Sequence, residues 1–551
     1  MSTRERYQQS ELVKANSKFS RVRATIESAF YGNNVHEVKS VAEAYELAKR
    51  QPGVIETDLP ILHTGDLGLP VGAKQLVYNH GKILGRTASA RHFVDDPEED
   101  TDALTNSLYE DIYAGHEQKY LKTTVLVGLD PSFSLKAHLM LPEDQAFNLL
   151  SYMLNFRFFD EKAAEMYEKS KLYDEGDLYF YFDPNVTDPA YPNGLAIFDA
   201  PHNCAAVFGL RYFGELKKGT LTLAWALAHR HGYAACHGGE QAFHFEDEDK
   251  EDKVFAFYGL SGSGKSTLTH ADHDDKYDIT VLHDDAFIIS REDGSSVALE
   301  PAYFDKTHDY PAGHHETKYY TTVMNCAVTQ DEAGRKVLVT EDLRNNNGRV
   351  IKSRYTSANR VDVEENPITA LFWIMKDNSL PPVLKVTDPV LATTLGLTLA
   401  TKRTSAENLP KGFDMNTLVI EPFADPFRAY PVGGDYGDFK ELFTKRGAEC
   451  YVLNTDAFCG KNIPKELTLE IIEKLVDDTD QWQAFGDFAG VSYMPLADYP
   501  VDLDSADYKQ NLRARMQDRL DWLNMYNGEH PKTPLPEEAK ECLEKIVSEL
   551  K

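Results

Sequence analysis

The chain has 551 residues, of which 42% are hydrophobic, and it carries a formal net charge of -30. This length exceeds one ordinary hydrophobic core, so we expect two or more domains. The strong negative charge argues against nucleic acids and anionic membrane surfaces as partners. The six cysteines are scattered without a C-x-x-C pair, which favours neither a zinc ribbon nor a disulfide framework. An N-terminal apolar leader and a long uncharged apolar run are both missing from the sequence, so we expect a cytoplasmic protein that does not enter membranes.

The first half of the chain predicts a mixed α/β arrangement. Val38 to Arg50 and Pro142 to Phe156 have apolar residues at helical spacing, which predicts two helices. Short apolar runs predict strands at 75–78, 123–129, 178–182 and 195–198. The acidic run Glu246 to Asp252 is typical of a surface turn, and we place a domain boundary there. The expected domains are residues 1–245, with a mixed α/β arrangement, and residues 246–551.

A glycine-rich segment follows the apolar run Val254 to Tyr258 and fits the phosphate-loop pattern G-x-x-x-x-G-K-[ST]. The run predicts a buried strand, and Ser266 to Ala271 predicts the first turns of a helix. In such a setting the backbone wraps closely around an anion, and the N–H groups at the helix start point toward it. The alternative is a plain turn between a strand and a helix. The loop residues expected to bind a nucleotide are Gly259, Leu260, Ser261, Gly262, Ser263, Gly264, Lys265, Ser266 and Thr267.

Beyond the loop, short strands are predicted at 279–282, 336–339, 370–375 and 450–453, and helices at 467–476 and 508–522. Asp284 and Asp285 end the first of these strands. A carboxylate at the end of a strand next to a phosphate loop holds the metal of a bound nucleotide in many enzymes. An Asp-Asp turn without such a role is the alternative.

Three further clusters carry chemically useful side chains. Lys217 and Lys218 are adjacent, which alone indicates no more than a solvated strand end. The segment from His229 to His237 contains three histidines and a cysteine, but their spacing matches no structural zinc motif. Arg86 follows a glycine in an expected turn, and arginine suits a two-pronged contact with a carboxylate.

Taken together, these motifs resemble the ATP-dependent phosphoenolpyruvate carboxykinase family. Residues 212–219, YFGELKKG, are similar to the family's YGGEMKKG, and His237 follows at the matching interval. Residues 300–307, EPAYFDKT, resemble EGGCYAKT, and residues 347–350, NGRV, resemble NTRV. Residues 85–87, the phosphate loop, the Asp-Asp pair, and residues 380–383 and 447–455 also match family segments in family order. The resemblance covers roughly residues 80 to 480 and rests on the order and spacing of these motifs.

The resemblance implies a carboxykinase-like α/β fold with an N-terminal substrate-binding domain, residues 1–245, and a C-terminal phosphate-loop nucleotide-binding domain, residues 246–551. It also implies an enzyme that decarboxylates and phosphorylates oxaloacetate with ATP, Mg²⁺ and Mn²⁺. The residues that it implies for the two metals are Lys218, His237 and Asp285 for Mn²⁺ and Ser266 for Mg²⁺. The residues implied for the dicarboxylate are Arg86, Tyr212 and Arg349. The residues implied for the nucleotide, besides the loop, are Lys265 on the outer phosphates and Glu300. The residues implied for catalysis are Lys217, Lys218, Lys265, Asp284 and Arg349.

Several positions depart from the family pattern. Ala286-Phe287 replaces Glu-His after the acidic pair, and His283 replaces the glycine before it. Asn462 stands where the family has a nucleotide-contacting arginine, and Phe213 where it has a glycine. Two alternatives to the carboxykinase reaction therefore stay open: a kinase of the same fold for another small carboxylate or hydroxy acid, and a nucleotide-binding protein without catalysis. The oligomeric state is not predicted.

Overall fold

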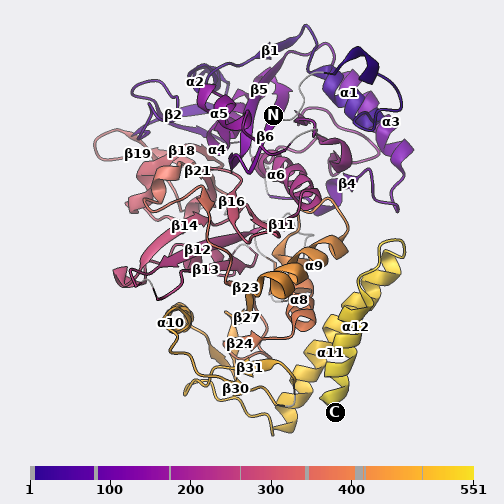
Figure 1. The fold of residues 1–551 in the computed structure, drawn as a ribbon. Coiled ribbons are helices and arrows are strands. Elements are labelled where there is room, and N and C mark those ends of the chain that lie inside the picture. Colours follow the sequence, from indigo (N-terminus) through magenta and orange to yellow (C-terminus); the bar gives the residue numbers. More distant parts are fainter. Residues whose placement is uncertain are drawn as a thin grey trace. The chain divides into compact units, whose positions relative to one another are not determined.

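The computed structural model describes residues 7–79, 85–172, 175–247, 249–260, 262–341, 347–403, 412, 414, 417–486 and 488–550 (Figure 1). These residues form several β-sheets and twelve α-helices, which confirms the predicted mixed α/β class. The chain packs into two compact units that interleave along the sequence. Unit 1 comprises Met1–Leu227, Leu299–Ala358 and Ser405–Lys411, and unit 2 comprises Ala228–Ala298, Asn359–Thr404 and Gly412–Lys551. The functional division between residues 245 and 246 stays a prediction, because compactness does not say which part binds a substrate.

Unit 1 is built on two sheets. The larger has the strand order β1-β5-β6-β8-β10-β9-β4, with β7 paired to β5, and mixes parallel and antiparallel neighbours. Its strands are β1 (Val35–Glu37), β4 (Arg91–Phe93), β5 (Tyr120–Asp130), β6 (Phe133–Pro142), β7 (Arg157–Phe158), β8 (Leu178–Asp183), β9 (Leu195–Asp199) and β10 (Cys204–Phe208). The second sheet has the order β17-β21-β18-β3-β2. Its strands are β2 (Val54–Pro60), β3 (Lys74–Tyr78), β17 (Tyr303–Lys306), β18 (Tyr320–Met324) and β21 (Arg349–Lys352).

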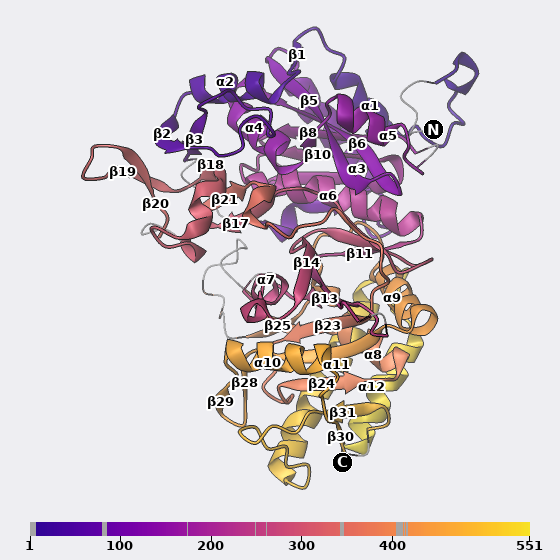
Figure 2. The same cartoon turned by 60° about the vertical axis from the view of Figure 1, so that its left-hand side comes forward.

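Four helices of unit 1, α1 (Arg21–Ala29), α2 (Val41–Arg50), α3 (Thr101–Ala114) and α5 (Glu161–Tyr167), begin at a side-chain cap, whereas α4 (Ala146–Asn155) has no side-chain cap and is buried along its whole length. Helix α2 follows the cap residue Ser40, whose hydroxyl accepts a hydrogen bond from the Glu43 N–H at 3.1 Å. The greater part of α6 (Phe213–Arg230) also belongs to this unit. A hairpin of β19 (Ala327–Gln330) and β20 (Lys336–Val339) projects beyond the second sheet in Figure 2.

Unit 2 is organised around an eight-stranded sheet with the order β14-β12-β13-β23-β27-β24-β31-β30. Its strands are β12 (Gly238–His244), β13 (Lys253–Tyr258), β14 (Asp278–His283), β23 (Ala370–Met375), β24 (Val383–Val386), β27 (Glu449–Asn454), β30 (Gln483–Ala484) and β31 (Val491–Tyr493). A smaller sheet joins β11 (Tyr233–Cys236), β15 (Phe287–Ser290), β16 (Ser296–Ala298) and β22 (Val363–Glu364). Two short hairpins complete the unit: β25 (Ala400–Lys402) with β26 (Leu418–Ile420), and β28 (Ala457–Phe458) with β29 (Lys461–Asn462).

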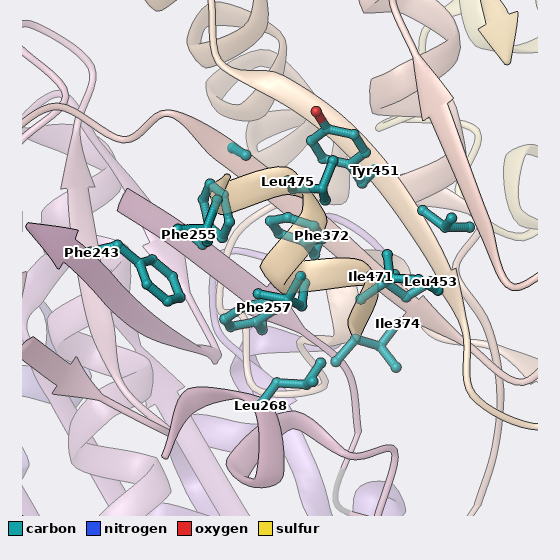
Figure 3. Close-up of a cluster of buried hydrophobic side chains, with 14 of the residues drawn as sticks. Phe243, Phe255, Phe257, Leu268, Phe372, Ile374, Tyr451, Leu453, Ile471 and Leu475 are labelled. Carbon is teal, nitrogen blue, oxygen red and sulfur yellow. The ribbon is translucent and has the colours of Figure 1, made fainter. Parts of the chain in front are cut away.

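The central strands of this sheet carry long apolar runs because both faces of the sheet are covered. On one face, Phe255 and Phe257 of β13 and Phe372 of β23 pack together with ring centroids about 5 Å apart. Figure 3 shows Ile471 and Leu475 of helix α10 (Lys465–Val476) against this cluster. This packing explains why the predicted 467–476 helix has apolar residues on a single face.

The remaining helices belong to unit 2: α7 (Lys265–Thr269), α8 (Pro389–Leu397), α9 (Val432–Glu441), α11 (Ala506–Glu529) and α12 (Glu537–Glu549). Helices α11 and α12 lie side by side as a hairpin (Figure 1). In the described part of the chain, every helix is too short or too polar to cross a membrane.

Candidate functional site

The predicted phosphate loop joins β13 to α7. Gly262 and Gly264 have φ angles of 81° and 106°, a backbone region that favours glycine. A Cβ atom on Gly259 would lie 2.2 Å from the Ser263 hydroxyl oxygen, so a larger residue at this position would force Ser263 to move. Thr455, which directly follows β27, donates its hydroxyl to the Ser263 carbonyl at 2.9 Å and holds the loop against the sheet. Ser261 lies outside the described residues.

The Asp284-Asp285 turn ends strand β14, and a histidine shapes it. The His283 Nδ1 accepts hydrogen bonds from the backbone N–H groups of Asp285 and Ala286 at 3.0 and 3.1 Å. Asp284 is buried, and its Oδ2 lies 3.4 Å from the His270 Nε2. Burial alone raises the pKa of a carboxyl group, but His270 and His283 hold the pKa of Asp284 well below its usual range. The substitution of a family glycine by His283 therefore gives the turn an internal support that sequence reasoning missed.

Asp285 faces two of the other predicted residues in unit 2. Its Oδ1 lies 3.2 Å from the His237 Nε2 and 3.7 Å from the Lys265 Nζ. The His237 Nδ1 lies 2.5 Å from the Ala424 carbonyl oxygen, which only accepts hydrogen bonds, so Nδ1 carries a proton. In the neutral imidazole the Nε2 lone pair then points toward the Asp285 carboxylate.

Two facing lone-pair donors of this kind suit a divalent cation, because imidazole nitrogen and carboxylate oxygen are ligands of Mn²⁺ and related metals. The hydrogen bond from His237 to a carbonyl group is also the usual way to orient a metal-binding imidazole. The donor set of His237 and Asp285 therefore fits the metal that the family resemblance implies. Lys265 adds a positive charge beside it, which suits a phosphate group.

A second group that could hold a cation lies in unit 1. His314, His315 and Glu316 offer ligand atoms within 4.8 Å of one another. The Glu316 carboxylate already accepts a hydrogen bond from the Lys352 Nζ at 2.5 Å. This ammonium group lies much closer to Glu316 than the Lys265 Nζ, at 3.7 Å, lies to Asp285. The Thr356 hydroxyl also donates to the same Glu316 oxygen at 2.9 Å. The pair in unit 2 is therefore the better metal candidate.

Unit 1 contributes the predicted carboxylate-binding residues. Arg349 begins strand β21 and is 3% exposed, and its Nη1 donates to the Gly348 carbonyl at 3.0 Å. Its Nη2 is buried and has no hydrogen-bond partner among the described residues. Lys306 lies opposite Arg349 in the β17–β21 ladder, and burial together with the Arg349 charge lowers the pKa of Lys306. A guanidinium nitrogen that has no partner among the described residues and lies beside a second cation is suited to bind an anion. Lys306 was not predicted as a site residue from the sequence.

Helix α6 places the side chains of its two adjacent lysines in different surroundings. The Lys217 Nζ lies 2.9 Å from the Glu300 Oε1, and both side chains are 0% exposed. The Asn155 amide donates to the other carboxylate oxygen of Glu300 at 2.6 Å. Lys218 is only partly buried, and its Nζ lies 5.4 Å from the Trp225 ring centroid. Glu300 and Lys217 thus have a structural pairing, while the nucleotide role of Glu300 and the catalytic role of Lys217 stay predictions.

The start of α6 also carries the aromatic residues of the predicted acid site. Phe213 is buried and packs edge-to-face on Phe304 with ring centroids 5.3 Å apart. The Tyr212 ring lies 6.2 Å from the same phenylalanine and is folded over Gly214, where a Cβ would approach it to 2.1 Å. Phe213 therefore occupies the hydrophobic interior.

Arg86 is buried at the beginning of the segment that leads into β4. The preceding Gly85 has a φ angle of 148°. Arg91, at the end of the same segment, lies 2.9 Å from the Glu215 carboxylate of α6 and donates to the Thr222 hydroxyl at 3.1 Å. This buried ion pair ties the Arg86 segment to α6, and sequence reasoning did not single it out.

The structure thus groups the predicted residues by unit. In unit 2 it brings together the phosphate loop with Lys265, His237 and Asp285, beside the buried Asp284. Unit 1 contains Arg86, Tyr212, Lys217, Lys218, Glu300 and Arg349. Ser266 and Thr267, in the first turn of α7, are exposed. Asn462 is exposed in the β28–β29 hairpin, whereas Ala286 and Phe287 are buried around the start of β15, which accounts for their apolar character.

The fold and these residues define a mixed α/β protein that offers favourable partners to a phosphate, a divalent cation and a carboxylate. A family model described as phosphoenolpyruvate carboxykinase matches residues 70–486. The chain therefore belongs to the phosphoenolpyruvate carboxykinase family, and the resemblance seen in its motifs is confirmed. It is similar to a protein of Aeropyrum pernix named phosphoenolpyruvate carboxykinase (ATP), with 26% identity over 308 residues, or 54% of this chain. The match spans 60% of the length of that relative.

Proposed function

We propose that the protein catalyses the ATP-dependent decarboxylation and phosphorylation of oxaloacetate, which yields phosphoenolpyruvate, ADP and CO2. The observation that carries the proposal is the convergence of Lys265, His237 and Asp285 beside the glycine-rich loop. A nucleotide phosphate needs a cation and a backbone that approaches it closely, and the divalent metal beside it needs ligands at the same place. Family membership supplies the reaction class.

The residues of unit 1 supply the second requirement, a grip on a small dicarboxylate. Arg349 keeps a buried guanidinium nitrogen that has no hydrogen-bond partner in the described part of the chain, and Lys306 is its neighbour across the sheet. Arg86 and Tyr212 are the further substrate-binding residues of the proposal. Desolvated cations of this kind bind carboxylates strongly because little water competes for them.

In the proposed reaction, the C–C bond to the leaving carboxylate breaks, and its electron pair stays on the substrate as an enolate. The enolate oxygen then attacks the γ-phosphorus of ATP, and the bond from this phosphorus to the ADP oxygen breaks. Mn²⁺ and Mg²⁺, when bound, neutralise the negative charge that develops on the enolate and phosphate oxygens. Lys265 would hold the outer phosphates, and Ser266 would offer a hydroxyl to the nucleotide's Mg²⁺. Lys218, with His237 and Asp285, completes the proposed Mn²⁺ ligand set.

Phosphorus NMR of a mixture of protein, ATP, Mg²⁺, Mn²⁺ and oxaloacetate tests the proposal. We expect the phosphoenolpyruvate signal to grow in step with the ADP signals and to depend on oxaloacetate. ADP and inorganic phosphate without phosphoenolpyruvate would indicate a different acceptor, namely water. Nucleotide binding without any turnover, in either direction, would contradict the proposal and favour a non-catalytic nucleotide-binding protein.

A second candidate is a kinase of the same fold that phosphorylates another small carboxylate or hydroxy acid. Phe213, which fills the interior beside Tyr212 and Phe304, motivates it, because the family has glycine at this position. ADP release should then be fastest with an acid other than oxaloacetate in a panel of small acids. A strict preference for oxaloacetate excludes this candidate. We further propose a cytoplasmic location, consistent with a metabolic enzyme family.

A further inference from the structure

A cavity of about 480 Å³ lies within unit 1, and none of the predicted site residues lines it. Its lining comes from α1, the end of α3 and the strands β5, β6 and β8. Helix α1 contributes the small side chains of Ala24 and Ala29, and Gly32, which follows the helix, adds no side chain, so the space stays open. Figure 1 shows α1 next to α3, and the two helices are in contact. The volume is within the range of sites for small organic ligands, about 300 to 1,000 Å³.

Aromatic rings form one wall of this cavity. Tyr109 and Tyr113 of α3 are stacked with an interplanar angle of 9°, and Tyr113 stacks on His116 with ring centroids 4.6 Å apart. Both tyrosines are more than half exposed, at 57% and 58%. Tyr120 and Tyr181 lie deeper and are buried. Flat aromatic faces favour a planar ring or a cation as a partner.

Three polar side chains of the lining, those of Thr25, Ser28 and Asn34, use their own polar hydrogens elsewhere, whereas Tyr109 and Tyr113 are exposed. Thr25 donates its hydroxyl to the Arg21 carbonyl at 2.7 Å, and Ser28 donates to the Ala24 carbonyl at 2.6 Å. Both nitrogen-bound hydrogens of the Asn34 amide are used on backbone carbonyls, at 3.2 and 2.5 Å. What these groups have left are oxygen lone pairs, which only accept hydrogen bonds.

Tyr120, Tyr181 and His116 likewise use their own polar hydrogens on other groups of the protein. Tyr181 donates to the Tyr120 hydroxyl at 2.9 Å, and Tyr120 donates to the Asp183 carboxylate at 2.8 Å. Burial raises the pKa of both tyrosines, so both hydroxyls keep their protons. The His116 Nδ1 lies 2.5 Å from the Tyr113 carbonyl oxygen and must donate to it, which leaves Nε2 as an acceptor in the neutral ring. Among the residues that line this described cavity, there is no lysine or arginine.

We propose that this cavity binds a planar aromatic compound that carries N–H donors or a positive charge, such as an aromatic amidine or amine. The ring would lie between the small side chains of α1 and the tyrosines of α3, and its donors would meet the lone pairs of Thr25, Ser28 and Asn34. Carboxylates and phosphates are poorer ligands here, because Thr25, Ser28 and Asn34 offer them only lone pairs and the described lining contains no lysine or arginine. The site is thus chemically opposite to the proposed oxaloacetate and nucleotide sites, and it does not depend on them.

Isothermal titration with two probes of one shape tests this proposal. 2-Naphthamidine carries a planar cationic donor head, and 2-naphthoate carries a planar anionic acceptor head on the same rings. We expect the amidine to bind at least about tenfold more tightly than the naphthoate. Equal affinities, or tighter binding of the naphthoate at this cavity, would overturn the proposal.

Two variants locate the binding. Ser28→Trp places a large ring in the cavity from an exposed position of α1, and it should reduce naphthamidine affinity about tenfold or more. Asn106→Trp, exposed on α3 and outside the lining, is the matched control and should leave the affinity unchanged. Thr25→Val keeps the shape but removes the hydroxyl lone pairs, and it should weaken the amidine alone. Naphthamidine affinity that survives both Ser28→Trp and Thr25→Val would show that the compound binds elsewhere.

Discussion

Two glutamates, one in each unit, are equally buried but are stabilised in opposite ways. Glu300 in unit 1 is enclosed with Lys217 and Asn155, so an ammonium group compensates its charge. Glu240, in strand β12 of unit 2, is 1% exposed, and its Oε2 accepts a hydrogen bond from the Ser296 hydroxyl at 2.7 Å. Its Oε1 has no hydrogen-bond partner among the described residues.

The difference shows how the surroundings of a buried carboxyl group decide its protonation. Burial first, and the nearby Glu364 charge as a smaller contribution, raise the pKa of Glu240 to about 8. Glu240 is therefore mostly protonated at neutral pH, directly across the sheet from His283, which shapes the Asp284-Asp285 turn. Glu300 instead belongs to an ion pair that anchors the helix carrying Lys218. Removing the Lys217 charge should consequently destabilise unit 1, whereas a side chain at position 240 that cannot ionise should stabilise unit 2 at alkaline pH.

The largest effect is expected for Lys217→Met, which keeps the side-chain volume but leaves the Glu300 carboxylate buried without its cation. We expect a loss of about 3 to 5 kcal/mol in the free energy of unfolding. Urea denaturation followed by circular dichroism measures this loss. The matched control is Lys218→Met, which should change stability by less than about 1 kcal/mol because Lys218 is only partly buried.

A second substitution, Glu300→Gln in the Lys217→Met background, removes the stranded charge and should restore part of the lost stability. If Lys217→Met alone unfolds at the same urea concentration as the unaltered protein, the ion pair is not the anchor of α6.

An intermediate effect of the opposite sign is expected for Glu240→Gln. The folded pKa of Glu240 is about 8 and the reference value is 4.5, so the folded protein keeps a proton that the unfolded chain loses. Its contribution to stability is therefore present below about pH 4.5 and is lost as the pH rises through 8. The glutamine variant cannot ionise and should be more stable at pH 8 by about 1 to 3 kcal/mol.

Unfolding measured from pH 5 to pH 9 should show the gain of Glu240→Gln shrinking toward the acidic end. Glu246→Gln, a surface substitution just before β13, is the control and should follow the unaltered protein at every pH. A gain that is constant across this range would mean that Glu240 does not titrate between these values.

The smallest effect is expected for Ser296→Ala, which removes the hydroxyl that donates to Glu240. The hydrogen bond should contribute about 1 kcal/mol, measured as the shift in the urea midpoint. The neighbouring Ser295 donates to Asp293 at the surface, so Ser295→Ala should have almost no effect. Equal losses in the two variants would show that the buried bond has no special weight.

Local sequence patterns were sufficient to predict several helices and strands, and to predict the phosphate-loop residues from their distinctive spacing. The apolar run before the phosphate loop is strand β13, and the single-faced pattern at 467–476 is part of α10. The helix predicted for Val38 to Arg50 was nearly right, although it begins at Val41 after the Ser40 cap. The glycine positions of the loop follow from backbone geometry that only glycine adopts easily.

Partners distant in sequence were not predictable from a single chain. Nothing in the doublet of Lys217 and Lys218 says which lysine is buried, because Glu300 lies far along the sequence. The sequence likewise does not say how the surroundings of Asp284 and Asp285 differ, because these depend on contacts with His270 and His237. The support of the Asp turn by His283 depends on a ring that reaches back to two backbone N–H groups.

The central claim is that His237 and Asp285 form a divalent-metal site used in the transfer of a phosphoryl group to an enolate. Electron paramagnetic resonance of Mn²⁺ titrated into the protein measures this site directly. Asp285→Asn should weaken Mn²⁺ binding at least about tenfold and abolish phosphoenolpyruvate formation. Asp278→Asn, exposed at the other end of β14, should leave both unchanged. Unaltered Mn²⁺ affinity and activity in Asp285→Asn would contradict the account.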